Sequence, residues 1–208
     1  MSPLPSPVVL VIMGVSGAGK STIGLLLAER LGWPFEEGDS LHPASNVEKM
    51  SEGIPLTDED RWPWLARIAD WIDNRLDTGE SGIITCSALK RSYRNVLNRR
   101  GSGVEFVYLS VEMAVLTDRV EHREDHFMPA SLLTSQLGTL EIPTAAEPAI
   151  QVDADPDARL VVDRILRDLD LTPKTIKPSQ TAKKPSAPSE TAPKPPRKRR
   201  PASPRQTR

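Results

Sequence analysis

The chain has 208 residues, 38% of them hydrophobic, and a formal net charge of −1 at pH 7. This length is enough for one domain with a substantial core, no apolar run approaches the length of a membrane span, and the single cysteine, Cys86, excludes an intramolecular disulfide. A lone thiol suits a reducing compartment, and residues 1–7 lack the basic region and cleavage site of a signal peptide. We therefore expect a cytoplasmic protein with no membrane partner.

The charge is unevenly distributed along the chain. Residues 172–208 contain eleven Lys and Arg and one acidic residue, whereas residues 1–171 contain 16 basic and 27 acidic residues. The C-terminal segment also holds nine of the twenty prolines, and it cannot bury enough apolar surface to offset the entropy of ordering. We expect an N-terminal extension at 1–7, a folded domain at 8–171 and a disordered Pro/Lys/Arg-rich tail at 172–208.

The first predicted element is a buried strand followed by a phosphate-binding loop. Residues 8–13 form an apolar run rich in β-branched side chains, typical of a strand buried on both faces of a parallel sheet. Residues 14–21, GVSGAGKS, fit the pattern G-x-x-x-x-G-K-[ST] at every fixed position. Glycines at 14, 17 and 19 allow a tight turn whose N–H groups point inward, and the positive end of the following helix adds to this anion site.

The loop predicts a nucleoside triphosphate ligand together with Mg²⁺. We expect Lys20 to contact the β- and γ-phosphates and the Ser21 hydroxyl to ligate the metal ion. The predicted nucleotide-binding residues of the loop are Gly14, Val15, Ser16, Gly17, Ala18, Gly19, Lys20, Ser21 and Thr22.

Strands and helices alternate along the rest of the chain. Hydrophobic periodicity and turn signals predict strands at 35–37, 82–86, 104–109 and 149–152. They predict helices from the loop to residue 31 and at 46–50, 57–77, 113–124, 131–140 and 157–169, with another entered through 87–94. This alternation predicts βαβ units, and hence an α/β fold with a parallel sheet and right-handed crossovers.

Two apolar features are predicted to belong to the core. Cys86 ends an apolar strand, which favours a packed small side chain over a nucleophile. One face of the helix at 57–77 carries a stripe that is more typical of a core than of a binding site: Trp64, Ile68, Trp71 and Ile72.

A polar segment, GDSLHP at 38–43, follows the second strand at the edge of the sheet where open α/β folds bind ligands. Asp39 is placed to orient and deprotonate an attacking hydroxyl or to help hold Mg²⁺ through water. The alternative is that Asp39 caps a turn. His42, directly before a proline, fits an ordinary turn as well as a site.

Basic residues provide candidates for binding an anion. Arg119 and Arg123 lie four residues apart on one helix face, directly before a break at 126–129 where a closing lid would hinge. The alternative is a solvated face neutralised by neighbouring acidic side chains. Three other cations follow strand-to-helix junctions and either project toward the cleft or form surface salt bridges: Arg61, Lys90 and Arg94.

Five segments, taken together, resemble a known family. They are MGVSGAGKST at 13–22, EGDSLHP at 37–43 followed by Asn46, Lys49 and Met50, GIPLTDEDRWPWL at 53–65, ITCSALKRSYR at 84–94, and HFMPASLLTSQLGTLEIP at 126–143. In this order, over residues 8–168, they resemble the P-loop, thermoresistant-type gluconokinases, which are similar in fold to the shikimate kinases. GDSLHP and CSALK are the discriminating parts.

The resemblance implies a three-layer P-loop kinase fold with a five-stranded parallel sheet and a helical lid, often in a homodimer. It implies transfer of the γ-phosphate of ATP, with Mg²⁺, to the 6-hydroxyl of D-gluconate. Shikimate kinases carry a D-x-D motif and a glycine triplet where this chain has residues 38–40 and 87–89, and this departure favours gluconate.

The resemblance also implies roles for individual residues. The implied catalytic residues are Lys20, Asp39 and Arg123, and Arg119 is a further nucleotide-binding residue. The implied substrate-binding residues are Asp39, His42, Arg61, Lys90 and His126.

Two alternatives stay open at this point. The first is a kinase of the same fold that acts on another small polyol acid or on a nucleotide. The second is a nucleic-acid-associated protein that acts through the basic tail, where residues 183–184 and 197–200 would contact phosphate backbones or form a nuclear import signal. A solvated tail that keeps an acidic domain soluble, or folds back on it, is an equally simple interpretation.

Overall fold

A five-stranded parallel sheet organises the part of the chain that the computed structural model describes, residues 4, 6–121, 130–155 and 157–174. β1 (Val9–Met13) occupies the centre, and the strand order is β2-β3-β1-β4-β5. The other strands are β2 (Phe35–Glu36), β3 (Gly82–Thr85), β4 (Val104–Ser110) and β5 (Ala149–Asp153), and every pairing is parallel. The predicted α/β fold with a five-stranded parallel sheet is confirmed.

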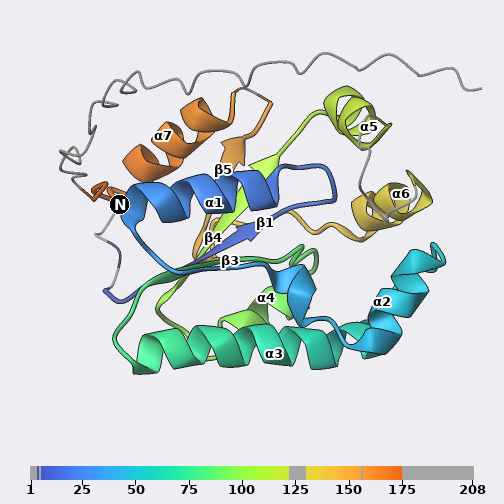
Figure 1. The fold of residues 1–208 in the computed structure, drawn as a ribbon, viewed down its shortest axis with the longest axis horizontal. Coiled ribbons are helices and arrows are strands. Elements are labelled where there is room, and N and C mark those ends of the chain that lie inside the picture. The colour runs from blue at the N-terminus through green and yellow to red at the C-terminus, as the bar shows by residue number, and fades with distance from the viewer. Residues whose placement is uncertain (1–3, 5, 122–129, 156, 175–208) are drawn as a thin grey trace, which may run out of the picture. The chain divides into compact units, whose positions relative to one another are not determined.

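Helices cover both faces of the sheet (Figure 1). α1 (Lys20–Leu31) and α7 (Ala158–Asp168) lie on one face, and α3 (Asp58–Asp77) and α4 (Arg91–Leu97) lie on the other. Alternate side chains of β1 therefore enter two different cores: Leu10 and Ile12 pack with α1 and α7, whereas Val11 and Met13 pack with α3 and α4. Because β1 is buried on both faces, its sequence is an uninterrupted apolar run rather than an alternating one.

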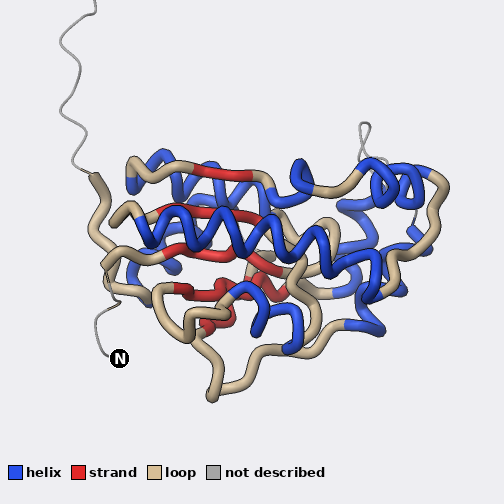
Figure 2. The backbone as a smooth tube through the Cα atoms, turned by 90° about the horizontal axis from the view of Figure 1, so that it is seen from below, coloured by secondary structure: helices blue, strands red, loops and turns tan. Residues whose placement is uncertain are grey.

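The remaining helices gather beyond the carboxyl ends of the strands, as Figures 1 and 2 show. They are a 3₁₀ turn, η1 (Gly38–Leu41), and the helices α2 (Ala44–Ser51), α5 (Met113–Glu121) and α6 (Ala130–Thr139). This is the end of the sheet where parallel α/β folds bind ligands. Residues 122–129, which contain Arg123, His126 and the predicted hinge of a lid, lie outside the described residues.

The start of α3 shows how local sequence sets a helix boundary. The Thr57 hydroxyl accepts from the Asp60 amide, and the Asp60 carboxylate accepts from the Thr57 amide, which forms a reciprocal capping box. One turn further on, Trp64 begins the apolar stripe and is fully buried with Ile68 and Ile72. The core assignment of this stripe is confirmed, although Trp64 also reaches the cavity described below.

Within the described residues, no helix is both long and apolar enough to cross a membrane.

Candidate active site

The phosphate-binding loop adopts the turn that its glycines predict. Gly19 has a φ of +91° and directly precedes α1, a backbone conformation that residues with a Cβ rarely adopt. The helix therefore starts at Lys20 with its first N–H groups directed toward the loop, which is an anion-binding arrangement. The Lys20 ammonium lies back across the loop and donates to the Val15 carbonyl at 3.0 Å.

A second glycine, Gly38, allows the polar segment after β2 to pack closely against the end of β3. A Cβ on Gly38 would lie 1.9 Å from the Thr85 carbonyl oxygen, so only glycine fits against the end of β3. The Gly38 amide donates to the Thr85 hydroxyl at 3.0 Å, and that hydroxyl donates to the Glu37 carboxylate. These contacts fix η1 against the carboxyl end of the neighbouring strand, and η1 carries Asp39. The sequence did not predict the 3₁₀ turn, because four residues are too few for a periodic pattern.

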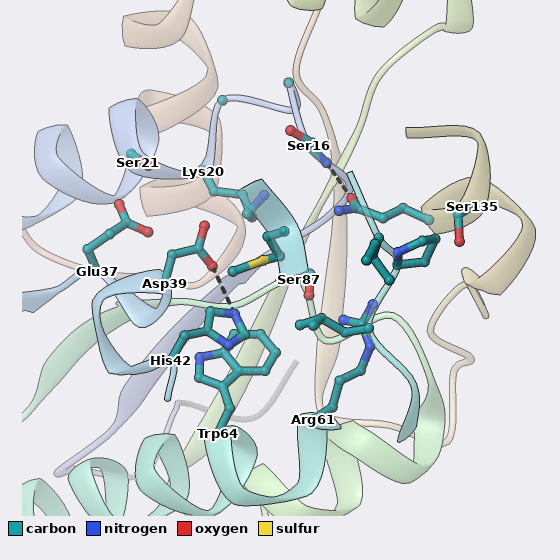
Figure 3. Close-up of a pocket in the computed structure, with 17 residues that line it drawn as sticks. Ser16, Lys20, Ser21, Glu37, Asp39, His42, Arg61, Trp64, Ser87 and Ser135 are labelled. Carbon is teal, nitrogen blue, oxygen red and sulfur yellow. Dashed lines mark hydrogen bonds and ion pairs between the residues drawn. The ribbon is translucent and has the colours of Figure 1, made fainter. Parts of the chain in front are cut away.

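One cavity of about 210 Å³ brings eight of the sixteen predicted site residues together (Figure 3). The phosphate loop and the start of α1 form one wall with Ser16, Gly17, Gly19, Lys20 and Ser21. Asp39 and His42, from η1 and the residue after it, and Arg61 from α3 also line the cavity. Asp39, at 57% exposure of its side chain, remains accessible to a ligand. The cavity therefore places an anion-binding loop within reach of a carboxylate, an imidazole and a guanidinium.

His42 is held more firmly than an ordinary turn residue. Its ring stacks on the Trp64 indole with a centroid distance of 4.0 Å and an interplanar angle of 15°. The indole N–H in turn donates to the Gly38 carbonyl at 2.7 Å, which ties the ring platform to η1. Burial lowers the pKa of His42 to about 4, against the opposing effect of Asp39 and with a further lowering by Arg61. The imidazole is therefore neutral at physiological pH.

The two predicted substrate-binding cations have different environments. Arg61 lines the cavity, and its guanidinium lies 5.8 Å from the centroid of the Tyr93 ring. Lys90 does not line this cavity, and its ammonium pairs with both carboxylate oxygens of Asp58 at 2.8 Å. Tyr93 also donates its hydroxyl to Asp58. The contacts of Lys90 are thus within a partly buried cluster with Asp58 and Tyr93, and its substrate-binding role stays a prediction.

Arg94 was predicted either to project toward the cleft or to form a surface salt bridge. It does neither, because its side chain is buried. Its guanidinium pairs with the Glu147 carboxylate at 2.6 Å and donates to the carbonyl oxygens of Ala88, Leu89 and Glu141. Ala88 has a φ of +45°, a left-handed conformation that is costly for a residue other than glycine. Arg94 therefore stabilises the strained turn between β3 and α4 and fastens it to the segment after α6.

We expect Arg94→Met to lower the free energy of unfolding by about 3–5 kcal/mol, because it leaves the buried Glu147 carboxylate without its partner. The hydrogen bond from Arg94 lowers the pKa of Glu147, so the pair stabilises the fold at neutral pH and this contribution is lost as the pH falls through that pKa. Urea unfolding at pH 7 measures the loss. A change below about 1 kcal/mol, the range of exposed pairs, would contradict this assignment; Arg30→Ala, which removes an exposed partner of Asp163, is the matched control.

Arg119 belongs to a second cavity, of about 260 Å³, on the other side of the phosphate loop. Gly17, Gly19 and Thr22 line this cavity together with Arg119 and the segment after β5. The Arg119 guanidinium donates to the Ala154 carbonyl at 3.0 Å. A nucleotide whose phosphates lie in the loop can place the rest of the molecule in this second cavity.

Several cavity residues were not predicted as site residues. Glu37 lies between β2 and η1, Ser87 follows β3, and Trp64 was assigned to the core alone. Gln136 extends from α6 to the phosphate loop, where its Oε1 accepts from the Ser16 amide at 2.7 Å (dashed in Figure 3). The family resemblance of the segment at 126–143 could have indicated a role for Gln136. Helical periodicity could not, because it does not distinguish a glutamine that binds the loop from one exposed to solvent.

Cys86 is buried beside the site without taking part in it. Its exposed fraction is 1%, and burial raises the pKa of its thiol to about 12. Because the thiolate is the nucleophilic form, the structure agrees with the packed role predicted for it.

Comparison with known proteins agrees with this geometry. The shikimate kinase family model matches residues 16–169. A gluconokinase of Gluconobacter oxydans (strain 621H) is 52% identical over 161 residues, which are 77% of this chain and 90% of the relative. The crystal structure of a gluconokinase from Sinorhizobium meliloti 1021 superposes with a TM-score of 0.71 at 49% identity, over 79% of this chain and 92% of the other. That of a sugar kinase from Janibacter sp. HTCC2649 gives 0.75 at 47% identity, over 80% and 96%.

A phosphate-binding loop at the carboxyl end of the central strand of a parallel sheet, facing a cavity lined by a carboxylate, an imidazole and a guanidinium, is the arrangement of a P-loop kinase that acts on a small molecule. The chain belongs to the shikimate kinase family of such enzymes and, within it, to the gluconokinases.

Proposed function

We propose that this chain transfers the γ-phosphate of ATP to the 6-hydroxyl of D-gluconate, giving 6-phosphogluconate. The single observation that carries the proposal is the cavity in which the phosphate loop faces Asp39, His42 and Arg61. Relatives named gluconokinase at up to 52% identity support gluconate as the acceptor.

The proposed catalysis consists of positioning and charge neutralisation, as is general for phosphoryl transfer. Lys20 moves from the Val15 carbonyl to the β- and γ-phosphates and stabilises the charge that develops on them. Asp39 orients the acceptor hydroxyl and takes its proton, and Arg61 binds the carboxylate of the sugar acid. Arg119 binds the nucleotide in the second cavity. Arg123 and His126, outside the described residues, act from the lid in this proposal.

We propose Mg²⁺ as the metal ion of the reaction. The Ser21 hydroxyl, in the first turn of α1, and the Glu37 carboxylate line the same cavity as the phosphate loop. Mg²⁺ prefers oxygen ligands, retains several waters and is bound by few protein groups together with substrate phosphates, so the Ser21 hydroxyl fits as a ligand. When bound, the ion neutralises charge on the phosphates.

A panel of acceptors tests the proposed function. ADP release is measured with D-gluconate, its stereoisomers, shikimate, glycerate and nucleoside monophosphates, each with ATP and Mg²⁺. We expect the highest kcat/KM for D-gluconate. Faster turnover of shikimate or of a nucleoside monophosphate would show that the acceptor has been misassigned.

We further propose that the folded domain, predicted to end at residue 171, continues to residue 174 and needs no residue beyond 175. Both core clusters consist of residues up to Leu171, and the Lys174 amide donates to the Arg30 carbonyl at 2.9 Å. We expect removal of residues 176–208 to leave the melting temperature and gluconate turnover within error of the full chain. A lost cooperative melt in the truncated chain would contradict the boundary.

The same truncation separates the two electrostatic roles predicted for the basic tail. If the tail binds the acidic domain, removing it changes kcat or KM in a salt-dependent manner without any added polyanion. If the tail binds nucleic acid, only the full chain binds, and the affinity falls steeply between low and physiological salt.

A further inference from the structure

Asn46, on α2, is buried to an exposed fraction of 2%, and its contacts determine the orientation of its amide. Its side-chain nitrogen lies 2.8 Å from the Asp60 carbonyl oxygen and 3.3 Å from Nδ1 of His42. A main-chain carbonyl can only accept, so the group facing it must be the amide NH₂ and not the amide oxygen. The two hydrogens of that NH₂ are then directed to Asp60 and to His42.

This orientation determines the tautomer of His42. Because Asn46 donates to Nδ1, this nitrogen must carry a lone pair, and a neutral imidazole then carries its only hydrogen on Nε2. The ring is kept neutral by burial, with 3% of the side chain exposed and the Trp64 indole stacked on one face. The charged groups that act on it are Asp39 of η1 and Arg61 of α3.

Nε2 of His42 lies 4.0 Å from Oδ1 of Asp39, and both residues line the cavity (Figure 3). This distance is too long for a direct hydrogen bond, but one hydroxyl oxygen at about 2.8 Å from each atom can bridge it. A hydroxyl bound there needs one donor for its lone pair and one acceptor for its proton. With the opposite tautomer, Nε2 and Oδ1 would both be acceptors, and the hydroxyl would lose one of its two hydrogen bonds.

We propose that Asn46 is a positioning residue that holds His42 in its Nε2–H form, so that His42 and Asp39 present one donor and one acceptor to a single hydroxyl of the acceptor substrate. The inference deepens the proposed function and rests on it for the identity of that substrate. It accounts for a buried asparagine that lies outside the cavity but is joined through His42 to a carboxylate within it.

The tautomer itself is measured first, by ¹⁵N NMR of the ring nitrogens in the full chain without substrate at pH 7. The chain has three histidines, and His42 is assigned by the signals that disappear in His42→Phe. We expect Nε2 to be protonated and Nδ1 not. A protonated Nδ1 overturns the inference, and because no acceptor is present, this outcome is independent of whether gluconate is the substrate.

Coupling between the two residues is measured with a double-mutant cycle in the acceptor assay. In Asn46→Asp a carboxylate faces Nδ1 and can only accept, so Nδ1 carries a hydrogen. In a ring that burial keeps neutral, Nε2 then has none, and we expect kcat/KM for gluconate to fall at least 10-fold while KM for ATP stays unchanged. His42→Phe retains a ring to stack on Trp64 but has no tautomer, so in this background Asn46→Asp should cost less than about 3-fold.

The cycle distinguishes positioning from a merely structural role. If Asn46 acts only by bracing Asp60, the loss caused by Asn46→Asp is the same in both backgrounds, and the inference is overturned. Should Asn46→Asp fail to fold, the ring-nitrogen spectrum of the unmodified chain still decides the tautomer. If the acceptor panel identifies a substrate other than gluconate, the proposed function is wrong. The double-mutant cycle is then run with that substrate, and it still tests whether Asn46 acts through His42.

Discussion

Lys20→Ala is expected to lower kcat at least ~100-fold, a loss of about 3 kcal/mol of transition-state stabilisation. The charge of Lys20 matters most while the γ-phosphoryl group is transferred, because the negative charge is then spread over the equatorial oxygens of that group. The Lys20 ammonium donates to the Val15 carbonyl, a contact whose loss is a minor cost to folding. KM for gluconate should therefore change much less than kcat, and the melting temperature little.

The control for Lys20→Ala is Arg30→Ala, at the other end of the same helix. It also removes one cation from α1, but Arg30 pairs with Asp163 at the surface, away from the cavity. We expect wild-type kinetics from this variant, because exposed ion pairs contribute little and are screened by salt. A Lys20→Ala enzyme within a few-fold of the parent kcat would show that the loop is not the catalytic phosphate site.

The fold was predictable because its strands have simple local signatures. Residues 8–13 must be buried on both faces, and this requirement appears directly as an unbroken apolar run that ends in the glycine-rich loop. Positions at which the backbone requires one particular residue were harder to predict from the sequence. Gly38 is required by the close approach of the Thr85 carbonyl. This contact joins η1 to the end of β3, 47 residues further along the chain, and no local sequence pattern predicts it.

The site was predictable where a residue belongs to a motif and less so where tertiary contacts decide its role. Lys20 and Asp39 lie where the motif and the family resemblance put them, in one cavity. Arg94 and Arg61 were both predicted from their positions after strand-to-helix junctions. Arg94 is nevertheless buried, because it pairs with the buried carboxylate of Glu147, 53 residues further along the chain. Trp64 serves both the core and the cavity, and an apolar stripe cannot distinguish one role from two.

The second large effect is expected from Asp39→Asn. The substitution preserves shape but removes the negative charge and the ability to accept a proton, so we expect kcat to fall by a factor of ~10²–10⁴, the range for a positioned general base. KM for ATP should hardly change, because the proposed site of the nucleotide phosphates is the loop after β1, whereas Asp39 lies in η1 after β2. The melting temperature should also be retained, since more than half of the Asp39 side chain is exposed.

Two neighbours make the result of Asp39→Asn specific. Ser40, the next residue of η1, donates to Glu36 outside the cavity, so Ser40→Ala perturbs the same turn and should leave turnover unchanged. Glu37 is the other carboxylate in the cavity, and it accepts from the Thr85 hydroxyl. If Asp39→Asn retained activity within a few-fold while Glu37→Gln abolished it, the proton acceptor would be Glu37. The hydroxyl bridged by His42 and Asp39 would then orient the substrate without being the one that is phosphorylated.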